Sequence, residues 1–201
     1  MFPEGLTNKQ HMYMIERARL VRGCLFANNI QVMLSGSSVN TAMFNGDGAS
    51  ATGRVENCTI ADCVNYHLTR NYRGGYPLEF VNCALVRNRT GLTEKTYNDT
   101  SSLDLNPASN LTFASCVFTR MTSGTADDKC VTITNPKFVG SGEHPYTPKT
   151  SSPLVKNKGV RLDWMDDALD LAGNPRLKDG QVDIGAYQCW LTAPGMMLLL
   201  R

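Results

Sequence analysis

Aromatic and basic side chains gather in one stretch of this 201-residue chain, NYHLTRNYRGGYPLEF (Asn65–Phe80). Its aromatic and cationic residues flank a Gly-Gly pair and are Tyr66, His67, Arg70, Tyr72, Arg73 and Tyr76. Aromatic faces pack on sugar rings, and a guanidinium group binds the carboxylate of an acidic sugar through two hydrogen bonds. The stretch therefore predicts a glycan-binding surface. The same residue types also cover apolar corners of a fold, and the sequence leaves both interpretations open.

A polysaccharide lyase is one reaction type that these residues could serve. It needs a base that abstracts the proton beside a uronate carboxylate, and a cation that stabilises the resulting charge. Arg73 or Lys129 is the candidate base, and His67 or Arg70 is the candidate cation. Their spacing is not diagnostic. Glycan binding without catalysis requires only aromatic and polar residues in line, which the stretch also supplies.

A glycoside hydrolase would instead need two carboxylates about 5–10 Å apart. The candidate pairs are Asp99 with Asp104, and Asp127 with a neighbour on an adjoining repeat. Asp127 and Asp128 in ADDKC (Ala126–Cys130) are also candidate calcium ligands, but two carboxylates supply too few ligands by themselves. A solvated loop is the favoured interpretation of this segment, and no cofactor is predicted beyond this calcium candidate.

The candidate residues lie between four segments that share one sequence pattern centred on a cysteine, and these segments must position them. Each has an apolar residue three positions before its cysteine and another two positions after it. The segments are VRGCLFANN (Val21–Asn29), VENCTIADC (Val55–Cys63), FVNCALVRN (Phe80–Asn88) and FASCVFTRM (Phe113–Met121). Successive cysteines are 34, 25 and 33 residues apart, a period typical of solenoids. Val131–Val139 is interpreted as a fifth, degenerate copy, in which Phe138 takes a core position.

The pattern inside each copy predicts short strands joined by corners. A cysteine and the apolar residue two positions later share one face of a strand. The apolar residue three positions before the cysteine also points inward only if the chain bends just before the cysteine. The residue at that bend is Gly23, Asn57, Asn82 or Ser115, and these types favour corners. Because apolar positions at helical spacing are missing, the sequence predicts an all-β parallel β-helix, with a β-sandwich as the alternative.

The repeat cysteines Cys24, Cys58, Cys83 and Cys116 are interpreted as reduced thiols stacked in the core. In-register stacking seldom gives the geometry that a disulfide needs. Asn29 and Asn88, five residues after their cysteines, are expected to begin a second ladder, in which Cys63 fills the intervening position. A metal site is disfavoured because no close Cys-x-x-Cys or Cys/His pair is present.

Composition excludes several classes of protein. The net charge is +2 with no long basic block, which does not indicate a nucleic-acid partner. No apolar run approaches the roughly 20 residues that span a bilayer. The opening MFPEGLTNKQ does not have the pattern of a signal peptide. Since the repeats begin near residue 20, leaving little room for a preceding cap, we expect a fragment whose leader lies elsewhere. The oligomeric state is left open.

The most specific pattern lies near the C-terminus, in YTPKTSSPLVKNKGV and LDWMDDALDLAGNPRLKDGQVDIGAYQCW. It resembles the C-terminal region of bacterial right-handed parallel β-helix proteins of the choice-of-anchor Q type, within the pectate-lyase-like superfamily. Their pattern is Ser-Pro-apolar, a following Gly, D-L-x-G-x-P-R and D-I-G-A-Y-E. The matching residues are Ser152, Pro153, Leu154, Gly159, Asp170, Leu171, Gly173, Pro175, Arg176 and Asp183 to Tyr187. Gln188 stands where the family usually has Glu, and the tail CWLTAPGMMLLLR continues past the usual end.

The resemblance implies a right-handed β-helix on a bacterial protein that is secreted or held at the cell surface and that interacts with polysaccharide. Because the last coil of a solenoid exposes unpaired backbone groups and an open core, we expect the ending to be a structural cap, tied together by Asp170, Arg176 and Asp183. Active-site carboxylates are the alternative interpretation of these aspartates.

The expected organisation is an N-terminal cap or truncated repeat in residues 1–20, β-helix in 21–145, and a last coil and cap in 146–201. The expected function is that of an extracellular polysaccharide-interacting protein. It is either a carbohydrate-active enzyme, a lyase or a hydrolase, or a non-catalytic glycan-binding or adhesive module. A purely structural piece of a larger surface protein is a third interpretation.

Overall fold

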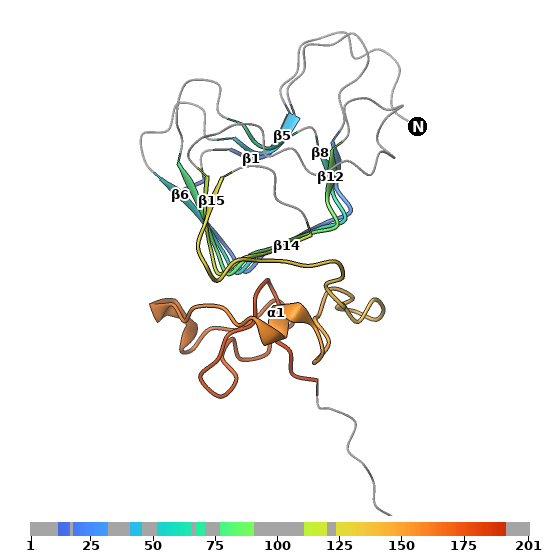
Figure 1. Cartoon of the computed structure of the whole chain (residues 1–201), viewed down its shortest axis with the longest axis vertical. Coiled ribbons are helices and arrows are strands. Elements are labelled where there is room, and N and C mark those ends of the chain that lie inside the picture. The colour runs from blue at the N-terminus through green and yellow to red at the C-terminus, as the bar shows by residue number, and fades with distance from the viewer. Residues whose placement is uncertain are drawn as a thin grey trace, which may run out of the picture.

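The computed structural model describes residues 12–16, 18–31, 41–45, 52–65, 67–70, 77–90, 111–119 and 124–191, and these residues form an all-β parallel architecture. Figure 1 shows the strands of successive repeats one behind another, with the sheets arranged around a common interior. The strands belong to four sheets, and every strand pair in them is parallel.

Each repeat contributes its strands to the sheets in the same order. The first sheet contains β2 (Leu20–Arg22), β6 (Gly53–Glu56), β10 (Leu78–Val81), β13 (Leu111–Ala114) and β15 (Thr125–Ala126). The second contains β3 (Leu25–Ala27), β7 (Thr59–Ala61), β11 (Ala84–Val86), β14 (Val117–Phe118) and β16 (Val131–Thr132). The third contains β4 (Ile30–Gln31), β8 (Val64–Asn65) and β12 (Arg89–Thr90). The fourth contains β1 (Met12–Glu16), β5 (Thr41–Asn45) and β9 (His67–Arg70).

The register of the strands confirms the alignment of the four cysteine segments. In the first sheet Val21, Val55, Phe80 and Phe113 lie side by side on successive strands. In the second sheet the aligned residues are Phe26, Ile60, Leu85 and Phe118. All of them point into one core, where the rings of Phe80 and Phe113 stack with centroids 5.1 Å apart. The packing of identical positions therefore fixes the register, since a slip by one residue would turn each strand inside out.

The bend before each repeat cysteine is present as predicted. Gly23, Asn57, Asn82 and Ser115 have φ values of 62°, 47°, 53° and 51°. This left-handed conformation costs little at Gly and is tolerated by Asn, which explains Gly23, Asn57 and Asn82, whereas at Ser115 the Asp127 carboxylate binds the backbone N–H. The bend turns the chain from the first sheet into the second, so that strands on either side of it face the same core.

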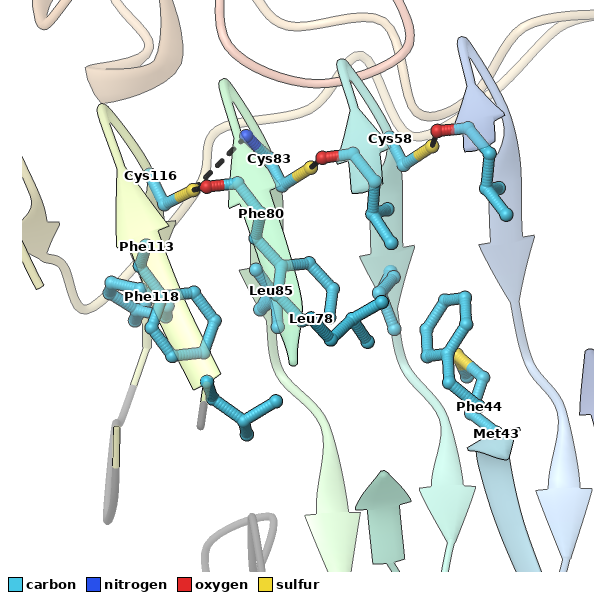
Figure 2. Packing of buried hydrophobic residues seen from close by; sticks show 14 of the residues in the cluster. Met43, Phe44, Cys58, Leu78, Phe80, Cys83, Leu85, Phe113, Cys116 and Phe118 are labelled. Atoms are coloured by element: carbon cyan, nitrogen blue, oxygen red, sulfur yellow. Dashed lines mark hydrogen bonds between the residues drawn. The ribbon is translucent and has the colours of Figure 1, made fainter. Parts of the chain in front are cut away.

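The repeat cysteines form a ladder of free thiols, as predicted (Figure 2). Cys58, Cys83 and Cys116 are fully buried, whereas Cys24 is half-buried. The backbone N–H of Cys83 donates to Sγ of Cys116 at 3.4 Å, and the Cys83 thiol donates to the Val55 carbonyl oxygen at 3.3 Å. Burial raises the pKa of Cys83 well above its ordinary value. The thiols thus act as small core residues that also join neighbouring repeats.

The second predicted ladder is also present. Asn29 donates from Nδ2 to Sγ of Cys63 at 3.7 Å, and the Cys63 backbone N–H donates to Oδ1 of Asn88 at 3.0 Å. Asn88 in turn donates to the Ile60 carbonyl oxygen at 2.8 Å. Side-chain amides and one thiol therefore satisfy backbone groups where the chain enters the third sheet.

The predicted fifth repeat was assigned to the wrong residues. Ala126 aligns with Phe113, and Cys130 accepts a hydrogen bond from the Cys116 backbone N–H at 3.3 Å, so the fifth copy begins before Val131. Phe138 lies outside the core that the strands enclose, in a separate cluster on the outer face of the second sheet. The pattern gave the wrong assignment because Ala126 and Cys130 are separated by one residue more than Phe113 and Cys116.

The C-terminal segment, defined here as residues 133–191, packs on the outside of the second sheet (Figure 1). Small apolar side chains point outward from the strands of the second sheet, and this segment covers them. They are Ala61, Ala84, Val86 and Val117, and the residues packed against them are Phe138, Leu154 and Ile184. The segment therefore lies against the side of the stack, because its packing removes these outward apolar side chains from water. A cap at the end of the last coil was expected instead.

The charged residues of the predicted cap act inside the C-terminal segment. Oδ1 of Asp170 accepts hydrogen bonds from the backbone N–H groups of Ala172 and Asn174 at 2.9 and 2.8 Å. Nη2 of Arg176, which is 1% exposed, donates to the carbonyl oxygens of Asp183 and Gly185 at 2.7 and 2.6 Å. The expected structural role of Asp170 and Arg176 is thus observed, although Arg176 binds backbone carbonyls and no carboxylate.

The C-terminal segment carries the two short helices that the structure describes, α1 (Pro153–Lys156) and η1 (Asp163–Met165). Ser152 caps α1, because its Oγ accepts the Leu154 backbone N–H at 3.1 Å. Neither helix has the length or the apolar character to cross a membrane.

Candidate functional site

A second corner of the stack carries a row of polar side chains. Asn28, Asp62 and Arg87 each follow a strand of the second sheet and share φ values of 56°, 56° and 55°. The backbone N–H of Asn28 donates to the Ala61 carbonyl oxygen, and that of Asp62 to the Val86 carbonyl oxygen, both at 3.2 Å. Each of the three residues comes four positions after its repeat cysteine. The row therefore runs across successive repeats, parallel to the direction of stacking.

Tyr146 of the C-terminal segment bridges this row. Its hydroxyl donates to Oδ2 of Asp62 at 3.0 Å and accepts from Nδ2 of Asn28 at 3.0 Å. The same Oδ2 of Asp62 accepts from Nη2 of Arg87 at 2.5 Å. Burial, together with the hydrogen bond to Asp62, raises the pKa of the Tyr146 hydroxyl. The phenol thus stays protonated at neutral pH and holds the corner and the C-terminal segment together.

The loop that presents Tyr146 is fixed at both ends. Phe138 and Pro148 form an antiparallel bridge, and the Val139 backbone N–H donates to the Thr147 carbonyl oxygen at 2.9 Å. Phe138 is 8% exposed and packs edge-to-face on Tyr146, with ring centroids 5.3 Å apart. Burial of Phe138 therefore anchors the loop, so that Tyr146 is held over the polar row.

A groove of about 730 Å³ opens between the loop and the corner. The side chains that give it its character are Asn28, Arg87, Lys137, Phe138, Tyr146 and Lys149. It combines two aromatic rings with three cations and with the neutral side chains of Asn28, Asn135 and Ser151. Such a surface can pack on a sugar ring and bind its hydroxyl or acidic groups.

The cations of the groove differ in what surrounds them. Arg87 is paired with Asp62, and its guanidinium carbon lies 5.2 Å from the centroid of the Phe138 ring. Within the part of the chain that the structure describes, no carboxylate lies at ion-pair distance from Lys137 or Lys149. Both lysines are exposed. The groove therefore carries excess positive charge.

Most of the predicted site residues lie outside the described residues. This group comprises Tyr66, Tyr72, Arg73, Tyr76, Asp99 and Asp104. His67 and Arg70 are at the two ends of β9, paired in register with Ala42 and Asn45 of β5. The glycan-binding and catalytic roles of all these residues therefore remain predictions.

Lys129 and Asp127 are described, and they lie in the turn between β15 and β16. Lys129 is exposed. Both carboxylate oxygens of Asp127 accept the Ser115 backbone N–H, at 3.1 and 3.2 Å, and Oδ1 also accepts the Lys129 backbone N–H at 3.2 Å. Asp127, in the last repeat, thus binds the backbone at the bend of the preceding repeat. Across the described ranges, no group of three or more His, Cys, Asp or Glu side chains is arranged to hold a metal ion.

A second charged cluster lies on the outer face of the first sheet. Glu56, which is 3% exposed, accepts from Nε of Arg22 at 2.8 Å and lies 2.9 Å from Nε of Arg54. Trp164 of η1 covers Arg22, whose guanidinium carbon is 4.2 Å from the ring centroid. Each carboxylate oxygen of Glu56 thus lies against an arginine, and the cluster is an ion-pair network on the outer face of the sheet.

Sequence reasoning missed the groove. The row at the second corner could have been found, because Asn28, Asp62 and Arg87 occupy one position of the aligned repeats. No such recurring position marks Lys137, Tyr146 and Lys149, since they lie in a segment without repeats. Their contact with the corner depends on how the C-terminal segment folds back.

No protein-family model matches the chain, and neither the curated proteins nor the solved structures contain a match to it. The resemblance of the C-terminal segment to the choice-of-anchor Q type therefore stays a proposal. The chemistry of the site rests on its own geometry.

Proposed function

We propose that this protein is a right-handed parallel β-helix that binds polysaccharide in the groove at its second corner. The observation that carries the proposal is the polar row of Asn28, Asp62 and Arg87, bridged by the partly exposed ring of Tyr146. A chain-like ligand lying along the stack would meet one polar group per repeat, about every 4.8 Å.

Two features support the β-helix. Successive repeats supply parallel strands to the same sheets in the same order, and crossover connections between parallel strands are right-handed in nearly all proteins. The proposed membership of the choice-of-anchor Q type adds an expectation of a bacterial protein that is secreted or held at the cell surface.

Binding is favoured over catalysis because no carboxylate lines the groove among the residues that the structure describes. Asp62, which lies beside the groove, accepts hydrogen bonds from both Arg87 and Tyr146 on the same oxygen, Oδ2, so that this oxygen is already engaged by two donors. A hydrolase would need two carboxylates at the bound sugar, and the described lining of the groove supplies neither. The protein is accordingly proposed to be a glycan-binding module, with a lyase or hydrolase as the alternative.

The test is retention of the purified chain on immobilised neutral and acidic polysaccharides. Tyr146→Ala should weaken retention at least tenfold, about 1.4 kcal/mol, because it removes an aromatic ring and a bridging hydroxyl. Trp190→Ala is the control, since Trp190 is an exposed aromatic residue outside the groove. Equal loss in both variants would contradict a role for the groove.

Two further measurements separate the alternatives. New reducing or unsaturated ends in the incubated polysaccharide would show an enzyme. The double variant Tyr72→Ala/Arg73→Gln tests the stretch that the sequence analysis singled out. If it loses retention while Tyr146→Ala keeps it, the binding site lies on that stretch and the proposal for the groove is wrong.

A further inference from the structure

We infer that the groove selects polysaccharides that carry anionic groups, and that Lys137 and Lys149 are the residues that determine this selectivity. The anionic group is a carboxylate or a sulfate ester, held between the two ammonium groups. The inference rests on the proposed polysaccharide binding and adds the chemical class of the ligand.

The two lysines are held together by their backbones. The Lys149 backbone N–H donates to the Lys137 carbonyl oxygen at 3.0 Å, although the residues are twelve positions apart. Lys137 has a φ of 52°, and its backbone N–H donates to Oδ1 of Asn135 at 2.8 Å. The adjoining bridge between Phe138 and Pro148 fixes the pairing. Both side chains thus start from a rigid pair of backbones and line the same groove.

The charge balance of the groove calls for an anion. Asp62 neutralises Arg87, which leaves the two ammonium groups without a compensating carboxylate among the described residues. Two like charges on adjacent backbones repel each other, and a bound anion relieves this repulsion while gaining two charged hydrogen bonds. A neutral sugar in the same position would gain neither.

Aromatic and polar groups next to the lysines fit the rest of the sugar. Tyr146 offers a partly exposed ring, and the Asn28 amide lies beside it. An anionic group that reaches the lysines would therefore place its ring near Tyr146. Inorganic anions lack the ring and gain only the charged part of the contact, so a saccharide is favoured over a free ion.

The experiment compares the affinity of the full chain for four polymers. They are a polyuronate, the same polymer with its carboxylates methyl-esterified, a sulfated galactan and a neutral glucan. We expect the polyuronate or the sulfated galactan to bind at least tenfold more tightly than the esterified and neutral polymers. Binding should also weaken as salt is raised, because exposed charges are screened over about 8 Å at physiological ionic strength.

Matched variants assign the selectivity. Lys137→Gln/Lys149→Gln should remove the tenfold preference for the anionic polymers. Lys156→Gln, an exposed lysine on α1 outside the groove, should keep the preference. Melting temperatures should be unaltered in both, since exposed substitutions change stability little.

The outcomes separate this inference from the proposed function. Equal affinity of the parent chain for the polyuronate and its methyl ester, with no preference for the sulfated polymer, overturns the anion selectivity while polysaccharide binding stands. A preference that survives in the double variant overturns the role of the two lysines. No retention of any polymer would overturn the proposed function itself. Which of the two anionic polymers binds more tightly identifies the group as carboxylate or sulfate.

Discussion

The side-chain amide of Asn82 and the backbone of Val160 are hydrogen-bonded to each other in both directions. Nδ2 of Asn82 donates to the Val160 carbonyl oxygen, and the Val160 backbone N–H donates to Oδ1 of Asn82, each at 2.7 Å. Asn82 also bends the chain between β10 and β11 with a φ of 53°. One residue therefore shapes a repeat and docks the C-terminal segment on it.

Replacing Asn82 should destabilise the protein by two separable effects. Asn82→Ala removes both hydrogen bonds to Val160 and places a Cβ-bearing residue without a compensating amide at a positive φ. We expect a loss of about 2–4 kcal/mol in the free energy of unfolding, measured by urea denaturation. Asn82→Gly is the control, because it relieves the backbone strain and loses only the amide. If both variants had the same free energy of unfolding as the parent, the pairing of Asn82 with Val160 would contribute nothing to stability.

Asp183 offers a test of the structural interpretation of the C-terminal motif. Its Oδ2 accepts the Cys189 backbone N–H at 2.7 Å, and burial raises the pKa of its carboxyl. Asp183→Ala should cost about 2 kcal/mol, since a buried N–H is left without a partner. Asp183→Asn keeps an acceptor oxygen and should lose much less. Both variants should retain polysaccharide in their folded fraction, and selective loss of retention would indicate an active-site aspartate instead.

The thiol ladder predicts an order of chemical labelling. Cys83 and Cys116 are fully buried, and burial raises the pKa of both thiols. Cys130 is half-buried at the end of the ladder, and hydrogen bonding from Cys116 lowers its pKa. Iodoacetamide should therefore label Cys130 before Cys83 in the native protein, and both at similar rates in urea, as read by peptide mass spectrometry. Rapid native labelling of Cys83 would contradict the stacked core.

The same thiols should make the fold sensitive to alkaline pH. The pKa of Cys83 and Cys116 is raised by burial above the ordinary value of 9.0, so these thiols stay protonated in the folded state while they ionise in the unfolded chain. Stability is therefore complete below pH 9.0 and falls as the pH rises above it, by about 1.4 kcal/mol per pH unit for each buried thiol. Urea titrations between about pH 8 and 10 measure the slope.

A matched variant isolates this effect. Cys83→Ala should have a shallower dependence of unfolding free energy on pH than the parent, although it is less stable at pH 7. Burial lowers the pKa of Arg176 to about 10, but this residue is present in both proteins, so its titration cancels in the comparison. An unchanged slope in Cys83→Ala would show that other groups cause the alkaline loss.

The sequence by itself determined the repeat and its register. Val21, Phe26 and Cys24 recur at fixed spacing in the later copies, and stacking like on like is the arrangement that buries them all. The bend also follows from the sequence, since Gly and Asn tolerate a positive φ at little cost. The sequence did not reveal the fifth copy, because one extra residue lies between Ala126 and Cys130 and breaks the spacing of the pattern.

Only the tertiary structure decided where the C-terminal segment lies and which surface it completes. The small outward residues Ala61 and Ala84 let that segment approach the second sheet closely, and this approach carries Tyr146 onto Asn28. Those two residues are 118 positions apart, and no local preference brings them together. The groove exists because burial of apolar surface fixed the segment on the side of the stack, and its polar residues were placed by that packing.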